Sequence, residues 1–119
     1  NASSFLGKLQ RNFYQNNKKR IPENLHALIK SKIGFAIWFY DDGYYYRRDK
    51  SLYIYLGTVS KNEARIASDV ITKNFKIINH VLDKKEKGFA LYFPASEREK
   101  IREILLENYV PTMAYKIPS

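Results

Sequence analysis

The stretch Ile33–Tyr40 is apolar almost throughout and ends abruptly in Asp41-Asp42-Gly43. We predict a helix here, and a helix without a polar face must be buried on all sides. The rest of the chain must therefore build a layer of structure around this helix. A chain of 119 residues with 45% apolar side chains is long enough for one compact domain with one core.

Strand-like sequence follows this helix directly. Gly43–Arg48 and Leu52–Leu56 are rich in tyrosine and branched side chains, and the polar residues between them are typical of a turn. In the second of these strands, leucine and isoleucine alternate with Tyr53 and Tyr55. Because successive side chains of a strand point to opposite faces, the two tyrosines must lie on the face away from the core.

Helices and a second strand pair complete the predicted order. Pro22 is placed to begin a short helix that runs to about Lys30. Two capping boxes are predicted to open the later helices: Ser60 with Glu63, and Ser96 with Glu99. Between those helices a second strand pair is predicted, at Ile77–Leu82 and Phe89–Phe93. The resulting order α-β-β-α-β-β-α indicates an α+β domain with an antiparallel sheet.

The charge of the chain is the first indication of a partner. Lysine and arginine number 21 against 12 acidic residues, which gives a formal net charge of +9. A polyanionic partner explains this excess most simply, because each neutralised phosphate releases counterions, and a basic surface kept for solubility is the alternative. We expect residues 1–22 to form a basic arm or linker, with a short helix at Ser4–Tyr14, and residues 23–119 to form a single domain.

Several classes of protein are excluded by composition. The sequence contains no cysteine, which excludes a disulfide framework, a thiol nucleophile and a cysteine-ligated zinc site. His26 and His80 are too far apart to suggest a histidine metal cluster. No apolar stretch approaches the roughly 20 residues needed to cross a bilayer. No signal peptide is visible, so we expect the chain to work in a reducing compartment inside the cell.

The paired acids Asp41 and Asp42 are the one constellation with evident chemistry. Carboxylate oxygens are hard donors of the kind that Mg2+ prefers, and a divalent cation held there would activate water and stabilise charge on a phosphate. Carboxylates at a helix C-terminus also oppose the helix dipole, which hints at a purpose other than folding. The alternative is that Asp42-Gly43 is only a helix-ending turn.

These features together resemble the LAGLIDADG homing endonucleases, and in particular the second half of two-motif, intron-encoded enzymes. The order α-β-β-α-β-β-α, with an apolar helix running into Asp-Gly, is the first part of the resemblance. The segments that carry it, in order along the chain, are Lys18–Leu25, Phe35–Gly43, the helix start at Ser60–Glu63, and Pro111–Pro118.

The resemblance implies a role for particular residues. Asp42 corresponds to the metal-binding carboxylate of the family motif, and Asp41 to the preceding position, where a backbone carbonyl often reaches the metal. Lys116 matches a lysine near the active site that would position water or neutralise charge in the transition state; without the resemblance, it would be read as a solvated lysine of the tail. The cofactor implied is Mg2+ or another divalent cation.

Two departures from the family pattern bear on catalysis. Related enzymes often carry a Thr-Gln pair before the second helix, with the glutamine facing the site. Leu56 and Gly57 stand at the corresponding positions, and a glycine has no side chain with which to orient a water molecule. Tyr40 replaces a smaller residue beside the acids.

The resemblance also implies that the sheet forms a saddle over double-stranded DNA, with strand side chains entering the major groove. The residues expected to contact the bases or the nearby backbone are Tyr44, Tyr46, Arg47, Arg48, Lys50, Tyr53 and Tyr55. Phosphate contacts are expected from Lys84, Lys85 and Lys87 in the second hairpin, with a further contribution from Lys18-Lys19-Arg20. The alternatives are solvated basic residues and tyrosines that pack only against cross-strand neighbours.

One motif supplies one metal-binding aspartate, whereas cutting both strands of DNA requires two. We therefore expect the chain to pair with a second LAGLIDADG domain, as a homodimer or with a missing first half. The residues expected at that interface are Ile33, Ala36, Ile37 and Tyr40. The leading hypothesis is thus a sequence-specific DNA endonuclease. The competing ones are a non-catalytic DNA-binding module and an RNA-binding helper of intron splicing on the same scaffold.

Overall fold

The predicted order of elements is confirmed by the computed structural model, which describes residues 13–15 and 18–119. Two short strands, β1 (Tyr14–Gln15) and β2 (Lys18–Lys19), come first. The domain then runs through α2 (Leu25–Leu28), α3 (Lys32–Asp42), β3 (Gly43–Tyr46), β4 (Ser51–Gly57), α4 (Lys61–Phe75), β5 (His80–Asp83), β6 (Phe89–Phe93) and α5 (Arg98–Glu107). Short 3-10 helices add η1 (Lys85–Lys87), η2 (Ala95–Glu97) and η3 (Pro111–Lys116).

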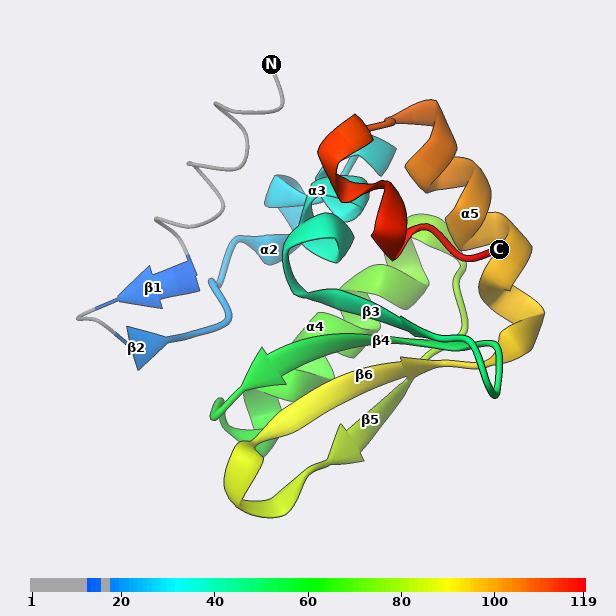
Figure 1. Cartoon of the computed structure of the whole chain (residues 1–119). Coiled ribbons are helices and arrows are strands. Elements are labelled where there is room, and N and C mark those ends of the chain that lie inside the picture. The colour runs from blue at the N-terminus through cyan, green and yellow to red at the C-terminus, as the bar shows by residue number, and fades with distance from the viewer. Residues whose placement is uncertain (1–12, 16–17) are drawn as a thin grey trace.

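The main sheet has the strand order β3-β4-β6-β5, and all of its neighbouring strands are antiparallel. The helices pack over one face of this sheet and leave the other face open (Figure 1). The sheet face beneath the helices carries Leu52, Ile54 and Leu56, none of which is accessible to solvent. The alternation predicted for β4 is therefore confirmed, and Tyr53 and Tyr55 lie on the open face.

Helix α3 is buried, as its composition predicts. Every residue from Gly34 to Tyr40 is buried, and the aromatic rings of this helix form the centre of the core. The Phe35 ring contacts the rings of Phe39, Phe75 and Phe93 at centroid distances of 5.3–6.4 Å. Burying such side chains contributes about 2–3 kcal/mol each relative to exposing them, so this helix is where much of the stability resides.

The capping box predicted at Ser60 is confirmed. The Ser60 hydroxyl accepts a hydrogen bond from the Glu63 N–H at 3.1 Å, and the Glu63 carboxylate accepts one from the Ser60 N–H at 3.2 Å. The second predicted capping box, Ser96 with Glu99, is wrong: α5 begins at Arg98 with Glu97 at the N-cap and no side-chain cap. Glu97 is buried instead, where its carboxylate accepts a hydrogen bond from Ile78 N–H and pairs with Lys100.

Other predicted boundaries shift by a few residues. The strand predicted at Ile77 begins at His80. Before it, the Ile78 N–H donates to the Glu97 carboxylate and not to a neighbouring strand, and the Asn79 side chain bonds to Ser68 and Thr72 of α4. The strand predicted over Gly43–Arg48 ends at Tyr46, and the helix predicted from Pro22 to Lys30 is limited to Leu25–Leu28.

The described part of the predicted N-terminal arm is packed onto the domain. Phe13, Ile21 and Pro22 are buried, and the Phe13 ring meets the Trp38 ring edge-on at 5.5 Å. The helix predicted at Ser4–Tyr14 lies outside the described residues, apart from Phe13 and Tyr14. Within the described ranges, no helix is long and apolar enough to span a membrane.

Candidate functional site

The two acidic residues lie where α3 passes into β3 without an intervening loop. Asp41 is exposed and Asp42 is half-buried. Gly43 follows in extended backbone at φ −83°, so it is not the left-handed glycine of a common helix-ending turn. Its role is spatial, because a Cβ at this position would lie 2.3 Å from the Phe39 carbonyl oxygen and 2.6 Å from the Phe39 ring. Glycine thus allows the helix to end on Asp42 and the strand to start at once.

Lys116 reaches the same junction from the other end of the chain. Its Nζ donates a hydrogen bond to the Gly43 carbonyl oxygen at 2.8 Å. The positively charged Lys116 side chain therefore lies against the residue that directly follows Asp42, although Lys116 and Gly43 are 73 residues apart in sequence. The catalytic role that the family resemblance implies for Lys116 stays a prediction.

Two arginines of α5 hold the segment that carries Lys116. Arg102 Nε donates to the main-chain oxygen of Pro118 at 3.1 Å, and Arg98 donates to the main-chain oxygen of Ser119 at 2.6 Å. Both bonds have a charged donor, and such bonds are stronger than neutral ones. Sequence reasoning did not single out these arginines. Nothing in the local pattern of α5 distinguishes them from other basic residues of an exposed helix face.

Two carboxylates that could hold a metal ion lie at this junction. Asp41 and Asp42 supply carboxylate oxygens of the kind that Mg2+ accepts. Among residues 13–15 and 18–119, no three histidine, cysteine, aspartate or glutamate side chains gather in a way that could hold a metal ion. A cation bound to these two acids would therefore need further oxygen ligands other than carboxylates of the described residues.

The predicted departure from the family pattern is also visible. Leu56 is completely buried in the core, and Gly57 adopts a positive φ of 84° where the register between β4 and β6 shifts. Gly88 packs closely against this point, since a Cβ on Gly88 would lie 1.9 Å from the Gly57 carbonyl oxygen. Neither Leu56 nor Gly57 presents a polar side chain to the acidic junction.

A row of aromatic rings crosses the open face of the sheet. Cross-strand pairing places Tyr44 opposite Tyr53, Tyr53 opposite Tyr92, and Tyr92 opposite His80. The row thus has one ring from each strand. The Tyr53 and Tyr92 rings are 5.5 Å apart and the Tyr92 and His80 rings 6.2 Å apart. Aromatic cross-strand pairs of this kind stabilise a sheet, so packing also accounts for part of this arrangement.

Tyr92 and His80 were missed by the sequence analysis. The alternation in Phe89–Phe93 could have found Tyr92, because Leu91 and Phe93 face the core and Tyr92 lies between them. His80 has no such signal, since its place beside Tyr92 depends on the register between β5 and β6.

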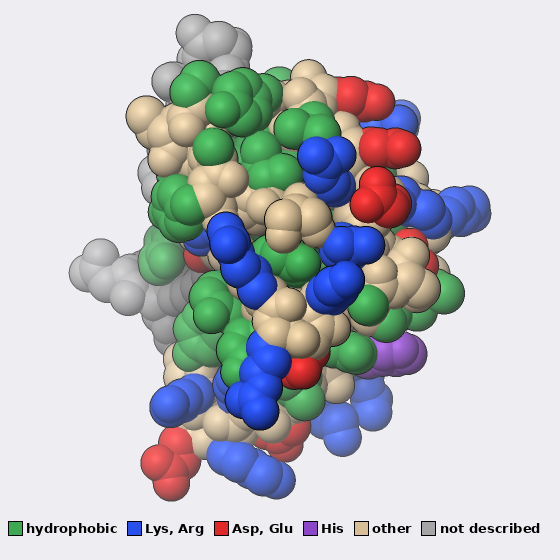
Figure 2. Space-filling model, turned by 45° about the vertical axis from the view of Figure 1, so that its right-hand side comes forward, with side chains coloured by type: hydrophobic (Ala, Val, Ile, Leu, Met, Phe, Trp, Pro, Cys, Tyr) green, Lys and Arg blue, Asp and Glu red, His purple; other side chains and the backbone are tan. Residues whose placement is uncertain are grey.

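The predicted basic residues lie in the hairpin turns at the two ends of the strands. Arg47, Arg48 and Lys50 are exposed in the turn between β3 and β4. Lys84, Lys85 and Lys87 are exposed in the loop between β5 and β6. In Figure 2, blue basic side chains run down the middle of the molecule, and the red acidic ones lie mostly towards its edges. Arg20, from the predicted basic run, is engaged with Glu63 at 3.2 Å.

The residues predicted at a domain interface are mostly covered within the chain. Ile33 is 36% exposed, whereas Ala36, Ile37 and Tyr40 are 0–5% exposed. The Tyr40 hydroxyl donates to the Leu105 carbonyl oxygen at 2.6 Å, which ties this side chain to α5. Burial raises the pKa of Tyr40, so it is neutral at ordinary pH. Three of the four residues predicted at the interface with a second domain are therefore already buried within this chain.

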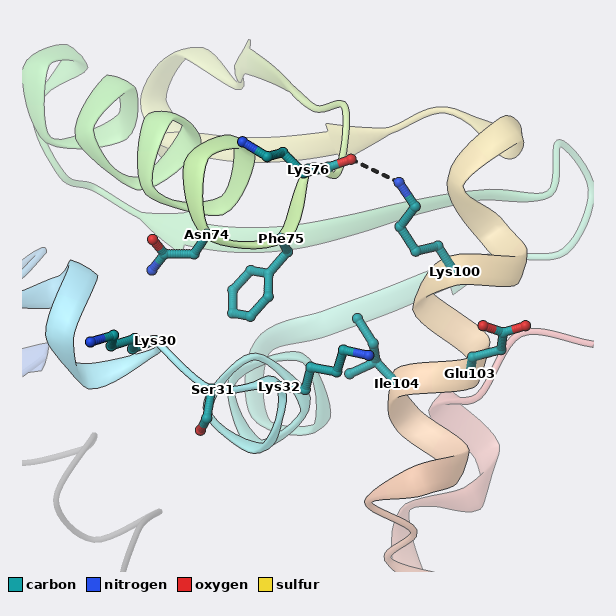
Figure 3. A pocket seen from close by; sticks show the side chains of 9 residues that line it. All are labelled: Lys30, Ser31, Lys32, Asn74, Phe75, Lys76, Lys100, Glu103 and Ile104. Atoms are coloured by element: carbon teal, nitrogen blue, oxygen red, sulfur yellow. Dashed lines mark hydrogen bonds between the residues drawn. The ribbon is translucent and has the colours of Figure 1, made fainter.

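A cavity on the helical side of the domain is separate from both the acids and the open sheet face. It measures about 440 Å³ and is lined by residues at the start of α3, the end of α4 and the side of α5 (Figure 3). The Phe75 ring points into it, and Lys100 bridges its upper edge through a hydrogen bond to the Lys76 main-chain oxygen. Lysine stems and apolar atoms dominate its walls, and it does not adjoin Asp42.

Known proteins that are similar to this chain are DNA endonucleases. The sequence matches the profile of the LAGLIDADG DNA endonuclease family over residues 1–101. It is 27% identical over 88 residues to "Probable intron-encoded DNA endonuclease 3" of Mycosarcoma maydis, a match that covers 74% of this chain and 64% of that protein.

A solved structure, "The homing endonuclease I-WcaI bound to its DNA recognition sequence", superposes with a TM-score of 0.75 at 25% identity. The superposition covers 92% of this chain and 50% of that one. The chain thus spans 64% of the curated relative and half of the solved one. It belongs to the LAGLIDADG DNA endonuclease family.

Proposed function

We propose that this chain supplies one DNA-cutting centre and one DNA-binding sheet to a sequence-specific, divalent-metal-dependent homing endonuclease. The observation that carries the proposal is the junction of α3 and β3. There Asp42 ends a buried helix, and Lys116 is bound to the next residue at 2.8 Å. A carboxylate that can hold a metal ion and a lysine bound to the adjacent residue can both contribute to hydrolysis of a phosphodiester.

Asp42, together with Asp41, would hold the metal. A bound Mg2+ or similar cation supplies a Lewis acid that activates water and stabilises charge on the phosphate. The remaining oxygen ligands would come from the DNA and from the partner domain. Lys116, fixed on Gly43, would place a positive charge beside the phosphate, where negative charge grows in the transition state. Arg98 and Arg102 would act as positioning residues for Lys116.

The open face of the sheet would lie against double-stranded DNA. The major groove admits a β-ribbon. The exposed tyrosine side chains of β3 and β4 would face the edges of the bases. Basic turns at the two ends of the strands would contact the phosphates on either side, which fixes the register of the protein on the duplex. This arrangement explains why the charged residues lie in the turns and the aromatic ones on the strands.

A second LAGLIDADG domain is required for a double-strand cut. The chain spans half of the solved relative, and the second domain would be either a second copy of this chain or a separate first half. A first half would allow an asymmetric DNA site, whereas a homodimer would favour a nearly palindromic one, because the symmetry of a protein is mirrored in its site.

A non-catalytic nucleic-acid-binding module is the second candidate. It is favoured by Leu56 and Gly57, which present no polar side chain where related enzymes often place a glutamine. This alternative predicts salt-sensitive binding without metal-dependent nicking. If the chain instead helps splicing, structured RNA will bind more tightly than duplex DNA at the same salt concentration.

The test is cleavage by the purified chain. Binding sites selected from a random duplex pool are placed in supercoiled plasmid, and nicking is followed with Mg2+ and with EDTA. We expect Asp42→Asn to nick at least about 100-fold more slowly, since a group that stabilises transition-state charge contributes about that much or more. Asp69→Asn, an exposed acid on α4, serves as the matched control and should nick like the wild type.

Undiminished nicking by Asp42→Asn would contradict the proposed centre. Binding of the selected site by the wild type, with no nicking at any Mg2+ concentration, would favour the non-catalytic module. Lys116→Met separates the roles further. It should slow nicking while leaving the affinity for DNA nearly unchanged.

A further inference from the structure

Within the described part of the chain, the open face of the sheet lacks the side chains that most often identify purine bases. Side chains on this face of the described strands β3–β6 are those of Tyr44, Tyr46, Ser51, Tyr53, Tyr55, His80, Leu82, Ala90 and Tyr92. Among them there is no arginine, lysine, asparagine or glutamine. These four residue types make the bidentate contacts that identify guanine and adenine in the major groove. The strands are therefore poorly equipped to read purines by paired hydrogen bonds.

A tyrosine-lined hollow occupies the middle of this face. It measures about 350 Å³, and its lining residues are Tyr44, Tyr46, Tyr53, Tyr55, Lys84 and Ala90. Tyr44 is 57% exposed and Tyr55 is 43% exposed, so ring surface is available to a ligand.

The hydroxyl groups of two of these tyrosines are already engaged. The Tyr55 hydroxyl donates to the Lys87 main-chain oxygen, and the Tyr53 hydroxyl accepts a long contact from Ser51 Oγ at 3.4 Å. Apart from Lys84 and the hydroxyls of Tyr44 and Tyr46, the hollow offers mainly the carbon edges and faces of its rings.

Only one base carries an apolar group on its major-groove edge. Thymine has a C5-methyl group there, whereas guanine, adenine and cytosine present hydrogen-bond donors and acceptors. An apolar hollow gains free energy by burying that methyl group and loses it by burying an unpaired polar edge.

We propose that Tyr44, Tyr46, Tyr53 and Tyr55 form a thymine-selective contact surface, so that the part of the DNA site beneath the strands is rich in A·T pairs. This inference rests on the proposed binding of duplex DNA by the open sheet face. Selection for guanine would be confined to the hairpin ends, where Arg47, Arg48 and Lys85, none of which lines the hollow, provide the required donors.

The test removes the methyl group alone. Sites are selected from a random duplex pool, and each thymine of a selected site is replaced singly by deoxyuridine, which lacks only the C5-methyl. We expect affinity to fall about fourfold at each thymine whose methyl group is fully buried by the hollow, the factor that corresponds to one buried methylene-sized group. Thymines under the hairpin ends should be insensitive.

Two variants test whether the difference in affinity between thymine and deoxyuridine arises in the hollow. In Tyr44→Ala the difference between thymine and deoxyuridine should shrink or vanish at one or more of the sensitive positions. Tyr109→Ala is the matched control, because Tyr109 is 53% exposed beyond the end of α5 and away from the sheet. It should keep the full fourfold difference.

The outcomes are distinct. Equal affinity for thymine and deoxyuridine at every position, or selected sites rich in guanine beneath the strands, would overturn the thymine inference while leaving DNA binding intact. Recovery of no specific duplex at all would contradict the proposed function, and the inference with it.

Discussion

Replacing Glu63 by glutamine tests how the N-terminal segment is attached to the domain. The Glu63 carboxylate accepts hydrogen bonds from Ile21 N–H at 2.8 Å, from Arg20 Nε at 3.2 Å and from Ser60 N–H at 3.2 Å. Glutamine has nearly the same shape, but it has one acceptor oxygen and no charge. It must therefore give up at least one of these donors and place its own NH2 group against that donor.

The size of the effect follows from these contacts. A hydrogen bond to a charged acceptor contributes about 1.5–3 kcal/mol, and the short bond from Ile21 carries most of this. The Arg20 side chain is 49% exposed, so its ion pair adds at most about 1 kcal/mol. We expect Glu63→Gln to lower the free energy of unfolding at pH 7 by about 2–3 kcal/mol.

The pH dependence of this loss is also predicted. Burial by itself would raise the pKa of Glu63, but the hydrogen bonds from Ile21, Ser60 and Arg20 outweigh it and lower the pKa below the ordinary value of 4.5. A carboxylate with a lowered pKa stabilises the fold above its unfolded pKa, and this stabilisation is lost as the pH falls through the folded value. The difference between wild type and Glu63→Gln should therefore shrink below pH 4.5.

Urea unfolding at pH 7 and pH 3.5 measures both quantities. Trp38, the only tryptophan, is 1% exposed and reports unfolding by its fluorescence. Glu99→Gln is the matched control, because the Glu99 side chain is 67% exposed and its ion pair with Arg98 is long, at 4.0 Å. Equal losses in the two variants at pH 7, or a Glu63→Gln loss that is as large at pH 3.5, would refute the reasoning.

Two further predictions concern the candidate active site. Gly43→Ala should lower the free energy of unfolding by about 3 kcal/mol, which thermal denaturation will show, because its Cβ would meet the buried Phe39 backbone; an unchanged melting temperature would contradict the packing argument. Arg102→Gln should slow nicking about tenfold, through loss of about 1.4 kcal/mol of positioning, without weakening DNA binding. Equal loss of binding would show a general structural role instead.

Much of the fold could be predicted because its signals are local. The apolar composition of Ile33–Tyr40 requires burial wherever that helix lies, and the alternation in Leu52–Leu56 assigns each side chain to one face of a sheet. The capping box at Ser60 needs only residues three positions apart. The same local rule failed at Ser96, because Glu97 occupies the N-cap of α5 and its buried carboxylate accepts a hydrogen bond from the distant Ile78 N–H.

The candidate site could be predicted only in part, because its parts are distant in sequence. By itself the sequence determined the acidic end of a buried helix, the tyrosines of β4 and the excess of basic charge. The tertiary structure alone decided that Lys116 bonds to Gly43, that Arg102 holds the tail, and that His80 joins the aromatic row. These contacts depend on the register of the strands and on where the C-terminal segment packs. No local periodicity encodes them, because residues distant in sequence meet only once the core has packed.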